Sequence, residues 1–362
     1  MKENKSLRIP SYYQNKITIV SFVLIIMMLY VHGIYDDAGL FPISFVVKSI
    51  ISRLSYRVIN PTYFSISGFL FFYGLNAISD CFPKMKRRIR TVLLPFILWN
   101  VIVVLEKLFF SHIPFTRAFF NYNLLDKYYN FSTGLYYLLI CPAGFHLWFL
   151  RDLIVYIAIS PIIYWLIKKF SWYVPVILLV TTPPLIHAFN LGHLEIAFFT
   201  LGGTIAIKSD LQSVRTFLSM PIVAISAAVY LGLAFTWDFF LPDYFRGEEY
   251  LSILFSVCGM ITVWRGYDGL SHITNLESNR LLQTLTNYTF FIYLFHEPVF
   301  FVIMQLGTRL IGENDWSLTI LYIINPALLI ILAIIVAKII KTIVPSLYSV
   351  LTGGRSARFQ SR

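Results

Sequence analysis

The sequence predicts an all-α protein, a polytopic membrane helix bundle of about ten transmembrane helices with both termini in the cytosol. Of its 362 residues, 57% are apolar and 17% aromatic, while only 13% carry a charge. A soluble globular domain usually has about a quarter of its residues charged. The mean hydropathy is +0.71, and no long polar stretch interrupts the chain. These observations exclude a soluble enzyme, a large extramembrane domain and an intrinsically disordered protein.

Apolar segments between charged or Gly- and Pro-rich connections predict the order of the helices. A helix needs about 17 to 25 apolar residues to cross a bilayer. The first run is too long for a signal-peptide core, so we expect it to be retained. The predicted spans are 17–34, 59–78, 92–110, 146–167, 173–189, 193–207, 217–236, 250–264, 285–308 and 317–340. They form one predicted membrane domain over residues 1–362, with a basic N-terminus at 1–16 and a basic tail at 341–362.

The formal net charge of +11, from 29 Lys and Arg against 18 Asp and Glu, is explained by membrane topology. With the N-terminus inside, most basic residues fall in the inner connections, whereas acidic residues such as Asp36, Asp243 and Glu313 fall outside. This asymmetry follows the positive-inside rule. With both termini on the same side of the membrane, the number of spans is even. We therefore expect both termini in the cytosol, membrane lipid as the surroundings and no nucleic-acid partner.

Several kinds of chemistry have no support in the sequence. Cys81, Cys141 and Cys258 are far apart and lie in or beside apolar segments, so they indicate neither a disulfide framework nor a metal cluster. The chain has no glycine-rich phosphate loop, no HExxH motif and no Gly-x-Ser-x-Gly elbow. We expect no metal, and the hydrolase, metalloenzyme and nucleotide-driven pump interpretations lose their main support.

Ionisable groups inside membrane spans are costly, so each of them is a functional candidate. The candidates are His32 at the end of the first span, Arg151 and Asp152 in the fourth, His193 and Glu195 in the sixth, and His296 and Glu297 in the ninth. In the predicted topology the groups of the first, fourth and sixth spans lie at similar depth near the outer leaflet and could converge. Glu106 and Lys107 lie late in the third span, and we expect them to snorkel to the outer interface.

A histidine with a carboxylate to orient it can take a proton from a hydroxyl near neutral pH. His32 is therefore a candidate base, and Asp152 is a candidate for the group that orients it. Two structural alternatives remain: an interfacial His32 bonded to a neighbouring helix, and an Arg151–Asp152 salt bridge.

In the ninth span, His296 and Glu297 precede Pro298, which is expected to kink the helix. Adjacent side chains on a helix point about 100° apart. We therefore expect the two to face different partners, one meeting a tunnel while a neighbouring helix holds the other.

Cations are concentrated on the inner side before the third span. We name as the basic run Lys86, Arg87, Arg88 and Arg90. Guanidinium groups can grip phosphate oxygens through two hydrogen bonds each, which suits a polyphosphate ligand arriving from the cytosol. The alternative is a topogenic anchor beside anionic lipid.

Two other segments have mainly structural interpretations. In the second span, Ser65, Ser67 and Gly68 predict close helix packing, with the lining of a tunnel as the alternative. The longest outer connection, 111–145, holds an aromatic stretch that is typical of an interfacial belt.

Five of these segments, in this order, resemble the integral-membrane acyltransferase family 3. They are His32, Ser67–Phe71, the basic run leading to Pro95, Trp148–Leu153 and Ile292–Pro298. The resemblance implies about ten helices and an acyl donor, acetyl-CoA or another acyl-CoA, reached from the cytosol. It also implies a bacterial inner-membrane enzyme that moves an acetyl or other short acyl group to a hydroxyl of a glycan acceptor, an exported surface polysaccharide or its lipid-linked precursor.

The resemblance also implies roles for individual residues. His32 takes the place of the catalytic histidine, and the family's basic pair falls among Arg87, Arg88 and Arg90. Many members have an arginine eleven residues before the histidine, where this chain has Ser21, and Lys16 is a candidate substitute. The residues expected to line or support a tunnel are Ser67, Arg151, Glu195, His296 and Glu297.

In the expected mechanism, His32 takes the proton of the acceptor hydroxyl, which attacks the thioester carbonyl as coenzyme A leaves. An acyl-histidine intermediate is an alternative route. The non-enzymatic alternative is a transporter or flippase of a lipid-linked glycan. A flippase needs cations along its path, whereas the cations of this chain cluster at the inner mouth.

Overall fold

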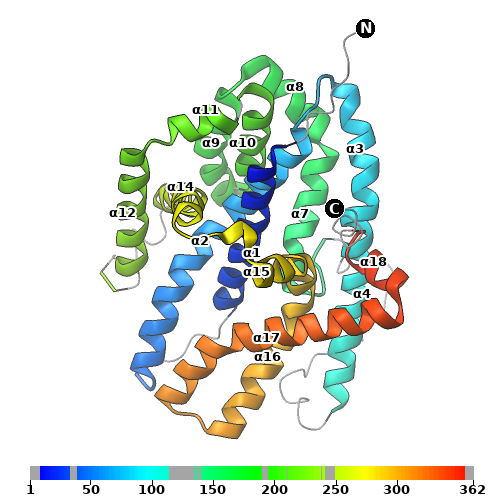
Figure 1. Ribbon diagram of the computed structural model, residues 1–362, viewed down its shortest axis with the longest axis vertical. Helices are drawn as coiled ribbons and strands as arrows, with labels where there is room; N and C mark the ends of the chain where they lie inside the picture. Colours follow the sequence, from blue (N-terminus) through cyan, green and yellow to red (C-terminus); the bar gives the residue numbers. More distant parts are fainter. Residues whose placement is uncertain are drawn as a thin grey trace. The chain divides into compact units, whose positions relative to one another are not determined.

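Helices account for the secondary structure that the computed structural model describes (Figure 1). The described residues are 9–32, 39–113, 134, 136, 140–189, 195–209, 211–237, 239–240 and 249–354, and no strand occurs among them. The all-α prediction is confirmed. His193, both chain ends and most of the predicted interfacial belt lie outside the described residues.

The chain divides into two compact units. Unit 1 comprises Met1–Val31, Val47–Lys84 and Tyr156–Thr286, and unit 2 comprises His32–Val46, Met85–Val155 and Asn287–Arg362. Each unit is assembled from segments that are far apart in the sequence, so neither is a simple N-terminal or C-terminal domain.

Unit 1 holds the first two helices and the middle of the chain. Its elements are α1 (Ser11–Val31), most of α2 (Pro42–Phe72), η1 (Ile78–Asp80), α8 (Ser160–Phe170), α9 (Tyr173–Phe189), α10 (Glu195–Lys208), α11 (Leu211–Phe217), α12 (Met220–Thr236), α14 (Glu249–Ile273), η4 (Leu276–Ser278) and α15 (Arg280–Thr286). Within it, α12 packs along α14, and α10 packs against α8 and α9.

Glycines bring the backbones of α2 and α10 into direct contact. A Cβ atom added at Gly68 would lie 1.9 Å from the carbonyl oxygen of Phe199, and one added at Gly202 would lie 1.9 Å from that of Ser65. The Ser65 hydroxyl donates to the carbonyl of Phe198 at 3.2 Å. The close helix packing predicted for this part of the second span is therefore confirmed.

Unit 2 holds the remaining helices. They are the second half of α3 (Cys81–Arg88), the π-helical turn η2 (Ile89–Leu93), α4 (Leu94–His112), η3 (Phe145–Leu147), most of α7 (Trp148–Ala158), α16 (Thr289–Ile311), α17 (Asp315–Ile343) and α18 (Pro345–Leu351). Figure 1 shows α16 and α17 side by side, as their many contacts require. The rings of Trp99, Phe291 and Tyr348 join α4, α16 and α18 in one aromatic cluster.

The second helix begins earlier than the sequence predicts. The predicted span starts at residue 59, whereas α2 runs from Pro42 to Phe72. Asp315 caps its first turn, because the carboxylate accepts from the backbone N–H groups of Ile43 at 3.0 Å and Ser44 at 2.7 Å. Lys48 and the arginines that follow it are too polar for a predicted membrane span. A helix can nevertheless form there, because it requires only backbone hydrogen bonds.

Three helical stretches of the described residues are long and apolar enough to cross a membrane: Ser11–Val31, Ile78–His112 and Asp315–Ile343. Two broken pairs, α7 with α8 and the two halves of α16, bring the number to five if each pair is one span. The shorter apolar helices Tyr173–Thr182 and Met220–Thr236 also occur. The chain is a multi-pass membrane protein, and ten spans with cytosolic termini stay a prediction.

Candidate active site

The break in α16 sets the geometry of the site in unit 2. Glu297 has extended backbone angles, φ −110° and ψ 130°, inside an otherwise helical segment. The two halves of the helix, Thr289–Glu297 and Val299–Ile311, meet at an angle of 63°. Pro298 has no N–H group to continue the helical hydrogen bonds, so the predicted kink before it is confirmed.

His296 lies at the end of the first half of α16 and is completely buried. Its Nδ1 is 2.6 Å from the carbonyl oxygen of Tyr293. A carbonyl can only accept, so Nδ1 carries the hydrogen and Nε2 of the neutral ring has a free lone pair. This Nε2 is buried without a hydrogen-bond partner among the described residues.

Glu297 and Tyr293 fix a second histidine, His146, in η3. One carboxylate oxygen of Glu297 is 3.0 Å from His146 Nδ1 and 3.2 Å from its backbone nitrogen. The Tyr293 hydroxyl donates to the His146 carbonyl at 2.7 Å. With Nδ1 donating to the carboxylate, the buried Nε2 of His146 also presents a lone pair and has no partner in the described part of the chain.

Three imidazole rings therefore lie in a row, with His296 in the middle. The ring centroid of His296 is 4.9 Å from that of His32 and 4.7 Å from that of His146. His146 is only 2% exposed, whereas His32 is partly exposed. We call these three residues with Glu297 the histidine cluster. His32 is the most exposed of the three histidines.

The backbone of Glu297 is extended and not helical. The expectation that His296 and Glu297 face different partners is therefore wrong. The angle of about 100° between neighbouring side chains holds only inside a helix. The extended backbone at Glu297 turns its carboxylate back, so both side chains approach His146.

Residues of α4 hold the segment that carries His146. The Asn100 amide oxygen accepts from the backbone N–H of Ala143 at 2.9 Å, and Lys107 Nζ donates to the Ala143 carbonyl at 2.6 Å. A Cβ atom at Gly144 would lie 2.8 Å from the Cε1 atom of His146, so a larger residue there would displace the ring. The Lys107 ammonium group is thus held by a backbone carbonyl of the predicted outer connection, and its position at the interface stays a prediction.

Asp152 pairs with its neighbour Arg151 in α7. The guanidinium Nε and NH2 groups of Arg151 both lie 2.7 Å from Asp152 Oδ1, and its NH1 donates to the carbonyl of Ile140. The salt bridge is therefore present, and it lies within one helix rather than between two. Among the described residues, the His32 ring lies against the rings of His296 and Phe145. Orientation of His32 by Asp152 stays a prediction.

The basic run occupies the last turn of α3 and the π-helical turn that follows. Lys86, Arg87 and Arg90 are exposed, and Arg88 is half-buried. Within the described residues, no hydrogen bond or ion pair fixes Lys86, Arg87 or Arg90. The π-helical turn is itself held by the C-terminal end of unit 2, because Gly353 fits against the backbone of Thr91. The basic run is thus an exposed cationic surface on a fixed support.

Other predicted site residues lie in unit 1. Ser67 is partly exposed on α2, and Glu195 is the first residue of α10. Lys16 is 1% exposed, and its Nζ lies 2.5 Å from Asp268 Oδ1 and 4.3 Å from the centroid of Trp264. Arg265 pairs with the same carboxylate. Lys16 is therefore committed to a buried ion pair of α1 and α14.

The comparison with protein families now decides the class of the chain. An acyltransferase domain family matches residues 16–342. The chain belongs to the integral-membrane acyltransferase family 3. This acyltransferase is also 24% identical over 316 residues to the succinoglycan biosynthesis protein ExoH of Rhizobium meliloti (strain 1021), covering 83% of this chain and 80% of that protein. No solved structure matches it.

Membership in this family makes the chain an acyltransferase, as the resemblance predicted, and removes the main support for a transporter.

The histidine cluster contains one residue, His146, to which the sequence assigned no role. The motif Trp148–Leu153, which was part of the resemblance, begins two residues after His146, but nothing in the sequence shows that residues 146 and 297 meet. Only the bend at Glu297 brings them together.

Proposed function

We propose that this acyltransferase moves an acetyl or other short acyl group from a coenzyme A thioester to a hydroxyl of an exported surface polysaccharide or its lipid-linked precursor. It would act in a bacterial inner membrane, with residues 1–362 as a single functional domain. The histidine cluster is the observation that carries the proposal. Its rings offer lone pairs for a proton, and its accessible member is the one that the family resemblance makes catalytic.

In the proposed reaction, His32 removes the proton of the acceptor hydroxyl as the oxygen attacks the thioester carbonyl. The C–O bond forms, the C–S bond breaks, and the coenzyme A thiolate takes up the proton that His32 received. A positioned general base accelerates such a proton-transfer reaction by about a hundred- to ten-thousandfold. His296 and His146 pack beside His32, and the carboxylate of Glu297 holds the His146 ring in place.

We assign the donor to the basic run. Lys86, Arg87 and Arg90 are exposed and lack partners among the described residues, so they are free to meet the phosphates of an acyl-CoA. The predicted topology puts this surface on the cytosolic side, where the donor is found. The competing role for these residues is anchoring to anionic lipid. If that is their role, removing them would leave donor binding unchanged.

The polysaccharide acceptor is supported by similarity alone. The relative ExoH is named for succinoglycan biosynthesis, and it is similar over most of both chains. Succinoglycan biosynthesis is a property of that protein. For this chain, the similarity supports a glycan acceptor and does not define which one.

The decisive experiment measures acyl transfer by the purified, lipid-reconstituted protein with acetyl-CoA as the donor. His32→Gln keeps a hydrogen-bonding side chain but cannot take the proton, so it should insert normally and lose at least a hundredfold in turnover. His272→Gln, at an exposed position in α14, is the matched control and should keep wild-type activity. Substantial transfer by His32→Gln would refute the base assignment and make His296 or His193 the next candidate.

A further inference from the structure

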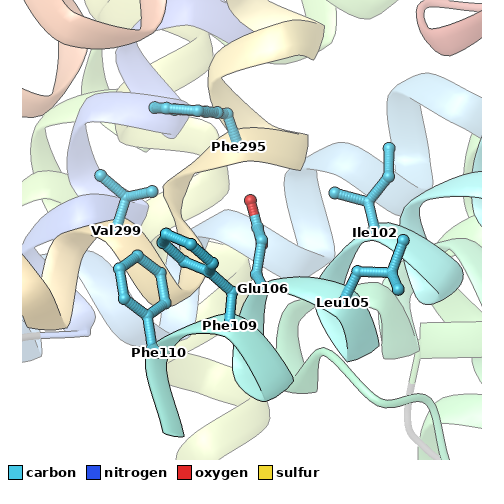
Figure 2. Close-up of a pocket in the computed structure, with 7 residues that line it drawn as sticks. All are labelled: Ile102, Leu105, Glu106, Phe109, Phe110, Phe295 and Val299. Atoms are coloured by element: carbon cyan, nitrogen blue, oxygen red, sulfur yellow. The ribbon is translucent and has the colours of Figure 1, made fainter. Parts of the chain in front are cut away.

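A groove of about 430 Å³ lies between α4 and the broken part of α16 in unit 2 (Figure 2). Its walls are apolar except for one carboxyl group. Ile102, Leu105 and Phe109 line it from α4, and Phe295 and Val299 line it from α16. This volume falls within the range of about 300 to 1,000 Å³ that is usual for small-molecule sites.

The groove opens toward the surroundings of the helices. Leu105 is 59% exposed and Phe109 is 64% exposed. Both belong to Ile78–His112, one of the stretches that can cross a membrane. We therefore expect lipid beside this face, so a molecule that enters the groove from the side must present an apolar chain.

Glu106 is the polar group of the groove, and Figure 2 shows its carboxyl group pointing between the two apolar walls. Its Oε2 atom is buried, and no group among the described residues donates to it. The expectation that Glu106 snorkels to the interface is therefore wrong. A carboxyl oxygen without a donor in an apolar setting is costly, so the fitting occupant brings a hydrogen-bond donor, such as a hydroxyl, to this point.

The groove borders the segment of α16 that carries His296 and Glu297. Phe295 directly precedes His296, and Val299 follows Glu297 by two residues. The carboxyl groups of Glu106 and Glu297 are near enough for their charges to interact. A molecule whose chain fills the groove therefore lies against the helix segment that carries two members of the histidine cluster.

We propose that this groove binds the apolar chain of a lipid-anchored glycan acceptor, and that Glu106 accepts a hydrogen bond from a hydroxyl at the polar end of that chain. The inference rests on the proposed function and deepens it, because it selects the lipid-linked acceptor over the free polysaccharide. The chain would hold the glycan in the membrane plane and deliver its hydroxyl to His32 from the lipid side.

The kinetic test compares two acceptors that share one oligosaccharide, prepared from the host's surface polysaccharide, one free and one with a decyl chain at its reducing end. Glu106→Leu should raise the KM of the decyl acceptor about tenfold, the loss expected for one hydrogen bond to a carboxylate, and leave the free acceptor unchanged. Leu105→Trp, which fills the groove, should have the same selective effect. Ile97→Trp, at an exposed site of α4 outside the groove, is the matched control.

A binding test needs no turnover. A neutral decyl glycoside with a photoreactive diazirine in its chain should label α4 and the α16 bend in the wild type, and Leu105→Trp should reduce that labelling. Labelling confined to other helices, or equal effects of the variants on both acceptors, would overturn the groove assignment. If the wild type acylates neither acceptor, the proposed function fails, and the labelling pattern still decides whether the groove binds the chain.

Discussion

Replacing Glu297 with glutamine separates the charge of this side chain from its hydrogen bonds. In the wild type, one carboxylate oxygen accepts from the ring Nδ1–H of His146 at 3.0 Å and from the backbone N–H of the same residue at 3.2 Å. The amide oxygen of glutamine can accept both bonds but carries no charge. Glu297→Ala removes the acceptor altogether and leaves both donors unpaired.

The two variants should therefore differ in stability and resemble each other in turnover. Each donor left unpaired costs about 1–3 kcal/mol, so Glu297→Ala should lower the free energy of unfolding by about twice that, while the glutamine variant should lose about 1 kcal/mol or less. The charge itself adds about 1–1.5 kcal/mol to the interaction with a protonated histidine, the difference between a hydrogen bond to a charged group and one between neutral groups. Loss of that charge should reduce kcat about five- to tenfold in both variants.

The assay follows release of the coenzyme A thiol together with ester formation on the acceptor, and unfolding is measured in the same lipid. Glu313→Gln, at an exposed position after α16, is the control for loss of a carboxylate. A Glu297→Gln protein with wild-type kcat would show that the charge takes no part in the reaction. Equal destabilisation by both substitutions would show that the hydrogen bonds to His146 do not hold the cluster.

Three further outcomes are expected. Replacing the three arginines of the basic run with glutamine should raise the KM for acetyl-CoA about ten- to a hundredfold or more with the fold intact, and an unchanged KM would leave only the lipid anchor. In a Cys141→Ser background, an impermeant thiol reagent applied to cells should label a cysteine at position 243 and not one at position 87, and the reverse would overturn the topology. Asp268→Leu should destabilise the protein by about 3–5 kcal/mol in unfolding measurements, because it strands the buried Lys16, and wild-type stability would contradict the ion-pair assignment.

The helical fold could be predicted because its signals are local. Apolar runs of spanning length, the kink before Pro298 and the small residues around Gly68 each act over a few turns of one helix. Helix ends were less predictable where a distant residue decides them. The first turn of α2 is capped by Asp315, which lies about 270 residues away in the sequence.

The site was predictable in part. His32, His296 and Glu297 stand out as ionisable groups in apolar segments, and the structure brings all three together. His146 did not stand out, because a histidine at the start of a span is unremarkable until its partner is known. Glu106 was misjudged because its distance from the end of the helix suggested an interfacial position, whereas its carboxyl oxygen lies inside a groove formed with α16.

The π-helical turn between α3 and α4 changes how the basic run relates to the rest of the third helix. Such a turn contains one more residue than an α-helical turn, and each residue of a helix advances its face by about 100°. The cations before Ile89–Leu93 therefore do not lie in the heptad positions that an unbroken helix would give them. Helical wheels drawn through this segment assign the arginines to the wrong side of α4. Inserting or deleting one residue here would rotate the basic run to another side of the helix and leave the groove intact.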